Sequence, residues 1–247
     1  MTFPESIRTL LFPDACVNCG ELLPRGDKGL CDKCLPLFRA EQTETCTICG
    51  YPQQDCQCYA GSVSQRHLGS YRLPIMRRLV LSQKEQKLHH VAGFLGRELA
   101  VRLQREPGLL YADTTVITFV PRHPITKRKT GTDQAKEIAS VLAKQLKLPL
   151  LPVLEHKKNL PLKPQKEMTA AGRKRAAEQR YRFDRKRFKN SDLFGKTVLL
   201  VDDIITTGAT VSACAELLYR HGASLVVAVA PARADPAPKE EETCLPK

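Results

Sequence analysis

The chain has 247 residues, 42% hydrophobic and 26% charged, so it can bury a core and is not globally disordered. Its 39 lysines and arginines outnumber 26 aspartates and glutamates, and the net charge of +13 favours polyanionic partners such as nucleic acids or phosphorylated metabolites. No apolar run approaches the roughly 20 residues that a membrane helix needs, and residues 1–11 lack the long apolar segment of a signal peptide. We therefore expect a cytoplasmic protein without membrane insertion.

Eight of the ten cysteines lie in the first 58 residues, in two sets of four. The sets are Cys16, Cys19, Cys31 and Cys34, and Cys46, Cys49, Cys56 and Cys58. Paired cysteines at CxxC spacing hold zinc in a reducing compartment. The spacing disfavours the alternative of eight ordinary buried cysteines. Residues 1–60 are thus predicted to form a double zinc-ribbon-like module with one or two structural zinc ions. Sequential and interleaved pairing both remain open, and the tighter CxC of the second set leaves that site open to being degenerate or empty.

The rest of the chain alternates between two kinds of periodic segment. Helical spacing of apolar residues or runs of β-branched residues predict, in order, helix 87–105, strand 114–120, helix 133–147, strand 150–154, strand 197–203, helix 209–221 and strand 225–230. This alternation is typical of an α/β fold with a parallel sheet flanked by helices. We expect one such domain over residues 61–235 and a flexible tail over 236–247.

The most informative segment runs from Val198 to Thr210 and reads VLLVDDIITTGAT. A buried strand leads into two carboxylates, and a turn of small residues then precedes a helix. Backbone N–H groups at a helix N-terminus form a cradle for phosphate, and a carboxylate pair at a strand end can accept hydrogen bonds from ribose hydroxyls. The alternative, a strand–turn–helix with a threonine cap and solvated aspartates, does not account for the whole pattern.

This segment resembles the phosphoribosyl pyrophosphate (PRPP) signature of type I phosphoribosyltransferases. Together with the N-terminal cysteines, it makes nearly the whole chain resemble the ComF family, competence-associated phosphoribosyltransferase-like proteins of bacteria. The resemblance implies a type I phosphoribosyltransferase fold and PRPP bound with Mg²⁺. It also implies a role in DNA uptake or natural transformation, with single-stranded DNA and a competence helicase or other DNA-uptake protein as partners.

The resemblance assigns roles to individual residues. Asp202 and Asp203 form the catalytic pair on the ribose, and Thr206, Thr207, Gly208, Ala209 and Thr210 hold the 5′-phosphate. Arg122 lies near the pyrophosphate, and a loop of Lys127, Arg128 and Lys129 is able to close over it. For these four residues a plain basic surface loop is an alternative of at least equal weight. The residues that match further family positions are Gly131, Gln134, Gln165, Arg173 and, more weakly, Lys84. The sequence departs from the family at Thr130, Thr132 and Asp133, where an arginine, a phenylalanine and an asparagine are usual, and at Ala176 in place of an asparagine.

Residues 157–189 carry most of the net charge, with thirteen lysines and arginines against three acids. Tyr181, Phe183 and Phe188 are interleaved with these cations, a composition that suits single-stranded nucleic acid because bases stack on aromatic rings. A solvated segment whose aromatic residues belong to the core explains the pattern equally well.

Two functions fit these observations. The first is an enzyme that transfers phosphoribose from PRPP to an unidentified acceptor. The second is a non-catalytic PRPP sensor or single-stranded-DNA-binding accessory of DNA uptake, which Ala176 and the altered segment 130–134 favour. A purely structural zinc scaffold leaves the phosphate loop unexplained.

Overall fold

The computed structural model describes residues 14–24, 29–42, 45–46, 63–85, 89–106, 108–157 and 179–234. The α-helices in this part of the chain are α2 (Cys34–Ala40), α3 (Pro74–Glu85), α4 (His89–Gln104), α5 (Pro124–Thr130), α6 (Gln134–Leu146) and α8 (Ala209–Arg220). The strands are β1 (Ser64–Ser70), β2 (Thr115–Phe119), β3 (Leu154–His156), β4 (Tyr181–Phe183), β5 (Thr197–Val201), β6 (Ile204–Ile205) and β7 (Leu225–Arg233). A 3₁₀ turn, η3, spans Asn190–Asp192. None of these helices combines the length and hydropathy that crossing a bilayer requires.

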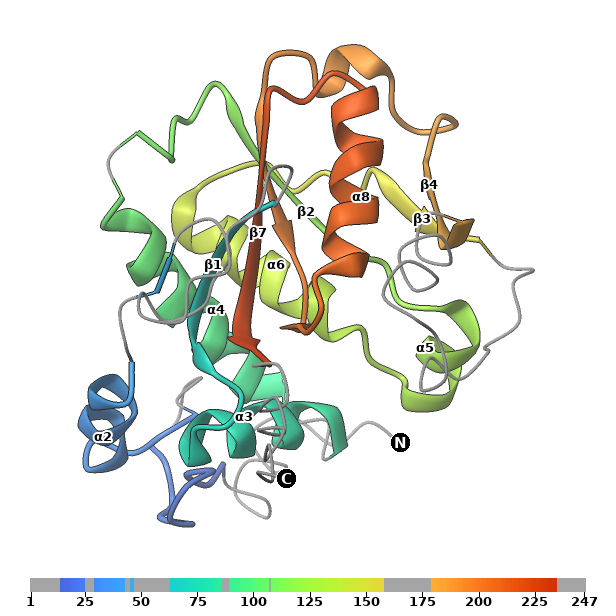
Figure 1. The fold of residues 1–247 in the computed structure, drawn as a ribbon. Helices are drawn as coiled ribbons and strands as arrows, with labels where there is room; N and C mark the ends of the chain where they lie inside the picture. The colour runs from blue at the N-terminus through green and yellow to red at the C-terminus, as the bar shows by residue number, and fades with distance from the viewer. Residues whose placement is uncertain are drawn as a thin grey trace, which may run out of the picture.

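The main sheet is parallel and has the strand order β1-β7-β5-β2, with β6 also paired to β7 (Figure 1). Phe119 at the end of β2 lies opposite Val201 at the end of β5. The segments that follow these two strands, beginning at Val120 and Asp202, therefore leave the same edge of the sheet side by side. Ligands bind at this carboxyl edge in open α/β folds, so the register places the predicted site where the fold favours one.

Two hydrophobic cores cover the two faces of the sheet. Side chains alternate along a strand, and in β5 the pair Leu199 and Val201 joins one core while Val198 and Leu200 join the other. Helices α3, α4 and α6 supply the first core and α8 the second, on opposite sides of the sheet in Figure 1. The predicted parallel sheet flanked by helices is confirmed.

The first cysteine set is built into the first core. Cys16, Cys31 and Cys34 belong to the same buried cluster as the apolar residues of α3 and α4. Phe38 of α2 meets Phe94 of α4 edge to face, with ring centroids 5.5 Å apart. The cysteine-rich segment therefore packs directly on the helices that cover the sheet.

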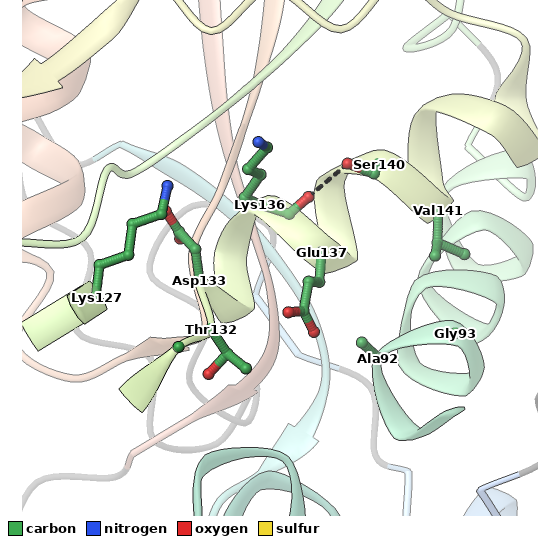
Figure 2. A pocket seen from close by; sticks show the side chains of 10 residues that line it. Ala92, Gly93, Lys127, Thr132, Asp133, Lys136, Glu137, Ser140 and Val141 are labelled. Carbon is green, nitrogen blue, oxygen red and sulfur yellow. Dashed lines mark hydrogen bonds and ion pairs between the residues drawn. The ribbon is translucent and has the colours of Figure 1, made fainter. Parts of the chain in front are cut away.

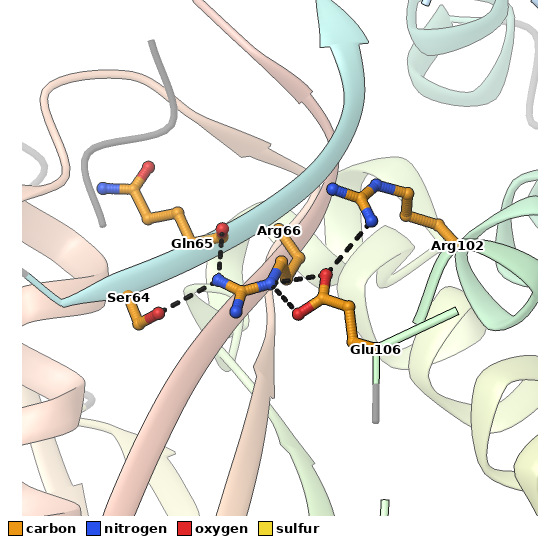
Figure 3. A network of polar contacts seen from close by, with 5 residues as sticks. All are labelled: Ser64, Gln65, Arg66, Arg102 and Glu106. Carbon is orange, nitrogen blue, oxygen red and sulfur yellow. Dashed lines mark hydrogen bonds and ion pairs between the residues drawn. The ribbon is translucent and has the colours of Figure 1, made fainter. Parts of the chain in front are cut away.

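Ion pairs tie the edge strand β1 to the end of α4 (Figure 3). The Arg66 guanidinium donates from Nε to Glu106 at 2.7 Å, and Arg102 reaches the same carboxylate at 3.1 Å. Arg66 also donates to the hydroxyl of Ser64 at 3.0 Å and to the carbonyl of Gln65 at 2.9 Å. Every acceptor in this network lies on β1 or after α4, so its role is to position the strand.

Four predicted elements differ from the structure. Strand 150–154 is displaced to β3, and only a single bridge from Leu150 to Ile117 extends the main sheet, because Pro152 lacks the N–H that a ladder needs. The strand predicted over 197–203 ends at Val201, and the strand predicted to end at residue 230 continues to Arg233. The loop expected at Lys127–Lys129 lies instead in helix α5. Pro124 favours a helix start, His123 caps it, and Gly131, with φ of 71°, ends it.

Candidate functional site

Four cysteines from two chain segments gather into one cluster. One ligand atom from each of Cys16, Cys19, Cys31 and Cys34 lies within 4.8 Å of all the others, and the sulfurs of Cys19 and Cys31 are 3.6 Å apart. Sulfurs placed tetrahedrally about 2.3 Å from a zinc ion would be about 3.8 Å from one another. The cluster can therefore bind a metal ion, and its dimensions suit tetrahedral thiolate coordination.

Polar contacts hold the cluster in place. Asn18 donates from its side-chain nitrogen to the sulfur of Cys34 at 3.2 Å, and its side-chain oxygen accepts a hydrogen bond from Arg78 of α3. Burial opposes ionisation of Cys16, but backbone N–H groups of Cys19 and Cys31 directed at its sulfur lower its pKa to about 7. Such outer contacts orient metal ligands. Of the second predicted set, Cys46 is half-buried, and Cys49, Cys56 and Cys58 lie outside the described residues.

A cavity of about 420 Å³ opens at the carboxyl edge of the sheet. Its walls come from the segments that follow β2 and β5, from α5, from the antiparallel pair β3 and β4, and from the beginnings of α6 and α8. The predicted site residues that line it are Arg122, Gln134, Asp202, Asp203, Thr206 and Thr210. The fold thus brings together residues that are up to 88 positions apart in the sequence.

The acidic pair and the threonine turn have the geometry of a cradle. Asp202 is only 9% exposed, and one of its carboxylate oxygens accepts the backbone N–H of Asp203 at 2.8 Å, which fixes its orientation. Gly208 has φ of 77° and precedes the first turn of α8, where the N–H of Ser212 bonds its carbonyl at 2.9 Å. Thr206 and Thr207 are exposed, and Gly208 and Ala209 are half-buried. The turn presents backbone N–H groups at the positive end of a helix dipole.

Arg122 is held at the cavity wall by the start of α6. Its guanidinium donates to the side-chain oxygen of Gln134, and the Gln134 side-chain nitrogen donates in turn to the hydroxyl of Thr132 at 3.1 Å. Gln134 is 1% exposed. Two predicted site residues, Arg122 and Gln134, are therefore partners of one another, and the buried glutamine orients the arginine.

Sequence reasoning did not find the aromatic row along another wall. The rings of His123 and His156 have centroids 4.6 Å apart, and His156 lies 5.3 Å from Tyr181, both edge to face. Burial lowers the pKa of His156 and raises the pKa of Tyr181, whose side chain hydrogen-bonds that of Thr210. His123 follows Arg122 directly in the sequence, so its position was a usable signal. His156 and Tyr181 meet only through the pairing of β3 with β4, which no local pattern indicates.

A second cavity, of about 430 Å³, lies between α4, the end of α5 and the first turns of α6 (Figure 2). Lys127 and Gly131 line this cavity and not the first one. The Nζ atom of Lys127 lies 3.6 Å from the Oδ2 atom of Asp133. Asp133 is buried and belongs to the walls of both cavities. Burial raises the pKa of Asp133 despite the opposing effect of Lys127, so this carboxyl ionises less readily than it would in water.

The other predicted site residues lie away from the first cavity or outside the described part. Arg128 is exposed on α5. Lys84 lies on α3 and Lys129 on α5, and their side chains are not described. Gln165, Arg173 and most of the basic segment 157–189 also lie outside the described residues.

Two aromatic residues of the basic segment are core residues. Tyr181 and Phe183 are 7% and 6% exposed and pack in the core on the α8 side, and Phe188 packs against that core. Cys214 is fully buried in the same cluster, where burial raises its pKa. The explanation that these aromatic residues belong to the core is therefore correct. Because Tyr181 and Phe183 are buried, they are not free to stack on bases.

Comparison with known proteins agrees with this geometry. The family of the phosphoribosyl transferase domain matches residues 133–245, a range that contains the acidic pair, the threonine turn and α8. DNA utilization protein YhgH of Escherichia coli (strain K12) is 26% identical over 236 residues, which cover 88% of this chain and 96% of YhgH.

Solved structures of two nucleotide enzymes are also similar. Glutamine PRPP amidotransferase from B. subtilis, complexed with ADP and GMP, is 21% identical with a TM-score of 0.38 over 57% of this chain, but this chain spans only 26% of that one. A hypoxanthine phosphoribosyltransferase from Staphylococcus aureus is 14% identical with a TM-score of 0.35, over 60% of this chain and 69% of that one. Both TM-scores are low. With the phosphoribosyl transferase match to residues 133–245 and the four-cysteine cluster ahead of it, the resemblance to the ComF family is confirmed.

Proposed function

We propose that the chain binds PRPP in the cavity at the carboxyl edge of the sheet and transfers or senses its phosphoribosyl group during DNA uptake or utilisation. In this proposal the turn Thr206–Thr210 holds the 5′-phosphate and the carboxylates of Asp202 and Asp203 accept hydrogen bonds from the ribose hydroxyls. The observation that carries it is that Arg122, the acidic pair and the two ends of this turn line one cavity. The acidic pair and the turn also lie inside the matched family range. The similarity to a DNA utilization protein supports the cellular role.

The charges of the cavity agree with a sugar that carries a phosphate and a pyrophosphate and is bound with a metal ion. Arg122 and Arg180 supply positive charge, and Asp202 and Asp203 supply the carboxylate oxygens that suit a hard cation. Mg²⁺ bound with PRPP would neutralise part of the pyrophosphate charge. The chain's own residues would hold the two ends of PRPP so that its C1′ carbon faces the acceptor.

We further propose that the metal of the four-cysteine cluster is zinc. Four thiolates at tetrahedral spacing leave no open coordination position, so the ion would be structural. We also propose the domain boundaries that the sequence predicts, with a double zinc-ribbon-like module over residues 1–60, a phosphoribosyltransferase-like domain over 61–235 and a flexible tail over 236–247.

The substitution Asp203→Asn tests the sugar site. It keeps the shape of the side chain but removes the charge from hydrogen bonds that are worth about 1.5–3 kcal/mol each, so PRPP affinity should fall roughly tenfold or more. Calorimetric titration with PRPP and Mg²⁺ measures the change. Asp113→Asn, which removes one exposed charge at the opposite edge of the sheet, is the matched control and should bind as wild type does. Equal affinities for wild type and Asp203→Asn would remove the sugar-site assignment. A pyrophosphate-release screen across nucleobases then separates transfer from sensing.

The second candidate, a single-stranded-DNA-binding accessory, is supported by three exposed cations after β4, Arg185, Lys186 and Arg187. Contacts of cations with phosphates release counterions, so DNA affinity should fall steeply with salt. Neutralising these three residues should flatten that dependence in a fluorescence titration. If the salt dependence of DNA affinity were unchanged, these three cations would contribute to solubility alone.

A further inference from the structure

His123 carries a buried donor that has no partner among the residues that the structure describes. The side chain is 6% exposed and caps α5, where its Nδ1 accepts the backbone N–H of Ile125 at 3.2 Å. A neutral imidazole has one protonated nitrogen, so Nε2 carries the proton. Within the described part of the chain, Nε2 is buried and has no hydrogen-bond partner. Buried donors are rarely left unpaired because the unpaired state is unfavourable, so this atom points to a missing acceptor.

The groups around His123 hold its ring in place and indicate the charge of the missing acceptor. His156 packs against it with the ring planes at 76°, and the Nδ1 of His156 is engaged with the carbonyl of Lys157 at 2.9 Å. His123 lines the cavity together with Arg122 and Arg180. A donor N–H among two guanidinium groups suits an anionic oxygen.

The position of His123 in the cavity indicates which group of PRPP it would contact. His123 lies in the segment that follows β2, whereas the threonine turn follows β5 and β6 and leads into α8. Different chain segments thus form the two polar regions of one cavity, and the threonine turn is assigned to the 5′-phosphate. The remaining anionic group of PRPP is its pyrophosphate.

We propose that His123 is a pyrophosphate-binding residue, whose neutral ring donates a hydrogen bond from Nε2 to a pyrophosphate oxygen of PRPP. This inference rests on the proposed function. It gives the histidine two duties, a cap for α5 through Nδ1 and a ligand contact through Nε2. Because α5 begins at the next residue, the cap fixes the orientation of the ring.

Two substitutions separate these duties. His123→Asn keeps an acceptor for the α5 cap but has no group at the position of Nε2. His123→Gln loses the short cap acceptor but can place its amide nitrogen near that position. The probes for calorimetry are PRPP and inorganic pyrophosphate, each with Mg²⁺, and ribose 5-phosphate, which lacks the pyrophosphate group.

The expected result is selective. His123→Asn should bind PRPP and inorganic pyrophosphate about tenfold to a hundredfold more weakly than wild type, with ribose 5-phosphate affinity unchanged. His123→Gln should keep most of the pyrophosphate affinity although its melting temperature falls. In wild-type protein labelled with ¹⁵N-histidine, inorganic pyrophosphate should shift the Nε2–H signal of His123.

Three outcomes would overturn the assignment. They are wild-type pyrophosphate affinity in His123→Asn, an equal loss of affinity for ribose 5-phosphate in that variant, and an unmoved Nε2–H signal in saturated wild type. The NMR measurement needs no variant and so does not depend on folding of the substituted chains. Wild-type protein that binds neither PRPP nor ribose 5-phosphate would instead overturn the proposed function itself.

Discussion

The four-cysteine cluster and the carboxyl-edge cavity organise polar groups in opposite ways. In the cluster, all four sulfurs face one another and three of the four cysteines are buried, so the site completes its own coordination. In the cavity, Thr206 is exposed and the buried Nε2 of His123 has no partner within the described residues. A site that satisfies its own ligands adds stability, whereas a site that leaves polar groups unmatched is ready to bind something else. Substitutions in the two regions should therefore produce different kinds of loss.

The largest effect should come from Cys31→Ser. Loss of one ligand from a structural tetrahedral site removes most of its metal affinity, and metal binding contributes directly to folding. The cluster shares a core with α3 and α4, so thermal unfolding of the whole domain should shift downward, with one zinc equivalent lost by elemental analysis. Cys214→Ala removes a buried thiol outside the cluster and should keep its zinc. Unchanged metal content in Cys31→Ser would contradict the view that the four-cysteine cluster is a metal site that stabilises the fold.

A smaller loss of stability but a large loss of binding is expected from Gly208→Val. A β-branched residue at φ of 77° is strained by about 1–3 kcal/mol, and its side chain would stand in the turn that we propose holds the phosphate. PRPP affinity should fall at least a hundredfold by calorimetry. Gly195 has φ of 71° and open space around it at the opposite edge of the sheet. Gly195→Val therefore carries similar strain and should bind PRPP normally. Equal affinities in the two folded variants would contradict the phosphate cradle.

The smallest effect should come from Asp133→Asn in the wall between the two cavities. Burial raises the pKa of this carboxyl in the folded state, so the folded protein binds its proton more tightly than the unfolded chain. The aspartate therefore lowers stability as pH rises from about 4 through its folded pKa, and the penalty persists at neutral pH. Asp133→Asn should unfold at a higher denaturant concentration than wild type at pH 7, with a difference of about 1 kcal/mol or less. The difference should shrink toward pH 4. A constant difference across that range would assign the effect to packing instead.

Elements with an unambiguous local pattern could be predicted from the sequence. The strands around Ile117 and Leu199 and the helix after Gly208 appear where periodicity indicated, because each is buried along its whole length or on one face. The predicted acidic pair and the ends of the threonine turn do line one cavity. These features depend on residues that are close together in the sequence, so a single sequence is enough to predict them.

Features that depend on distant partners could not be predicted. Tyr181 reads as a stacking residue beside cations, but the pairing of β4 with β3 and the contact of β4 with α8 turn it into the core. Lys127 reads as part of a closing loop, but the proline and histidine before it start a helix that carries it to the second cavity. In both cases the local pattern is ambiguous, and tertiary contacts decide between its readings.

The position of β7 in the sheet has a consequence for how the protein is made. This strand pairs with β1, β5 and β6, and thus joins both halves of the sheet. Synthesis proceeds from the N-terminus, so β1 and β5 emerge from the ribosome before the strand that connects them. The cysteine cluster can capture its metal early, but the two sheet halves cannot be joined until residues 225–233 are released. During this interval a chaperone would find the edges of β1 and β5 that later pair with β7 exposed.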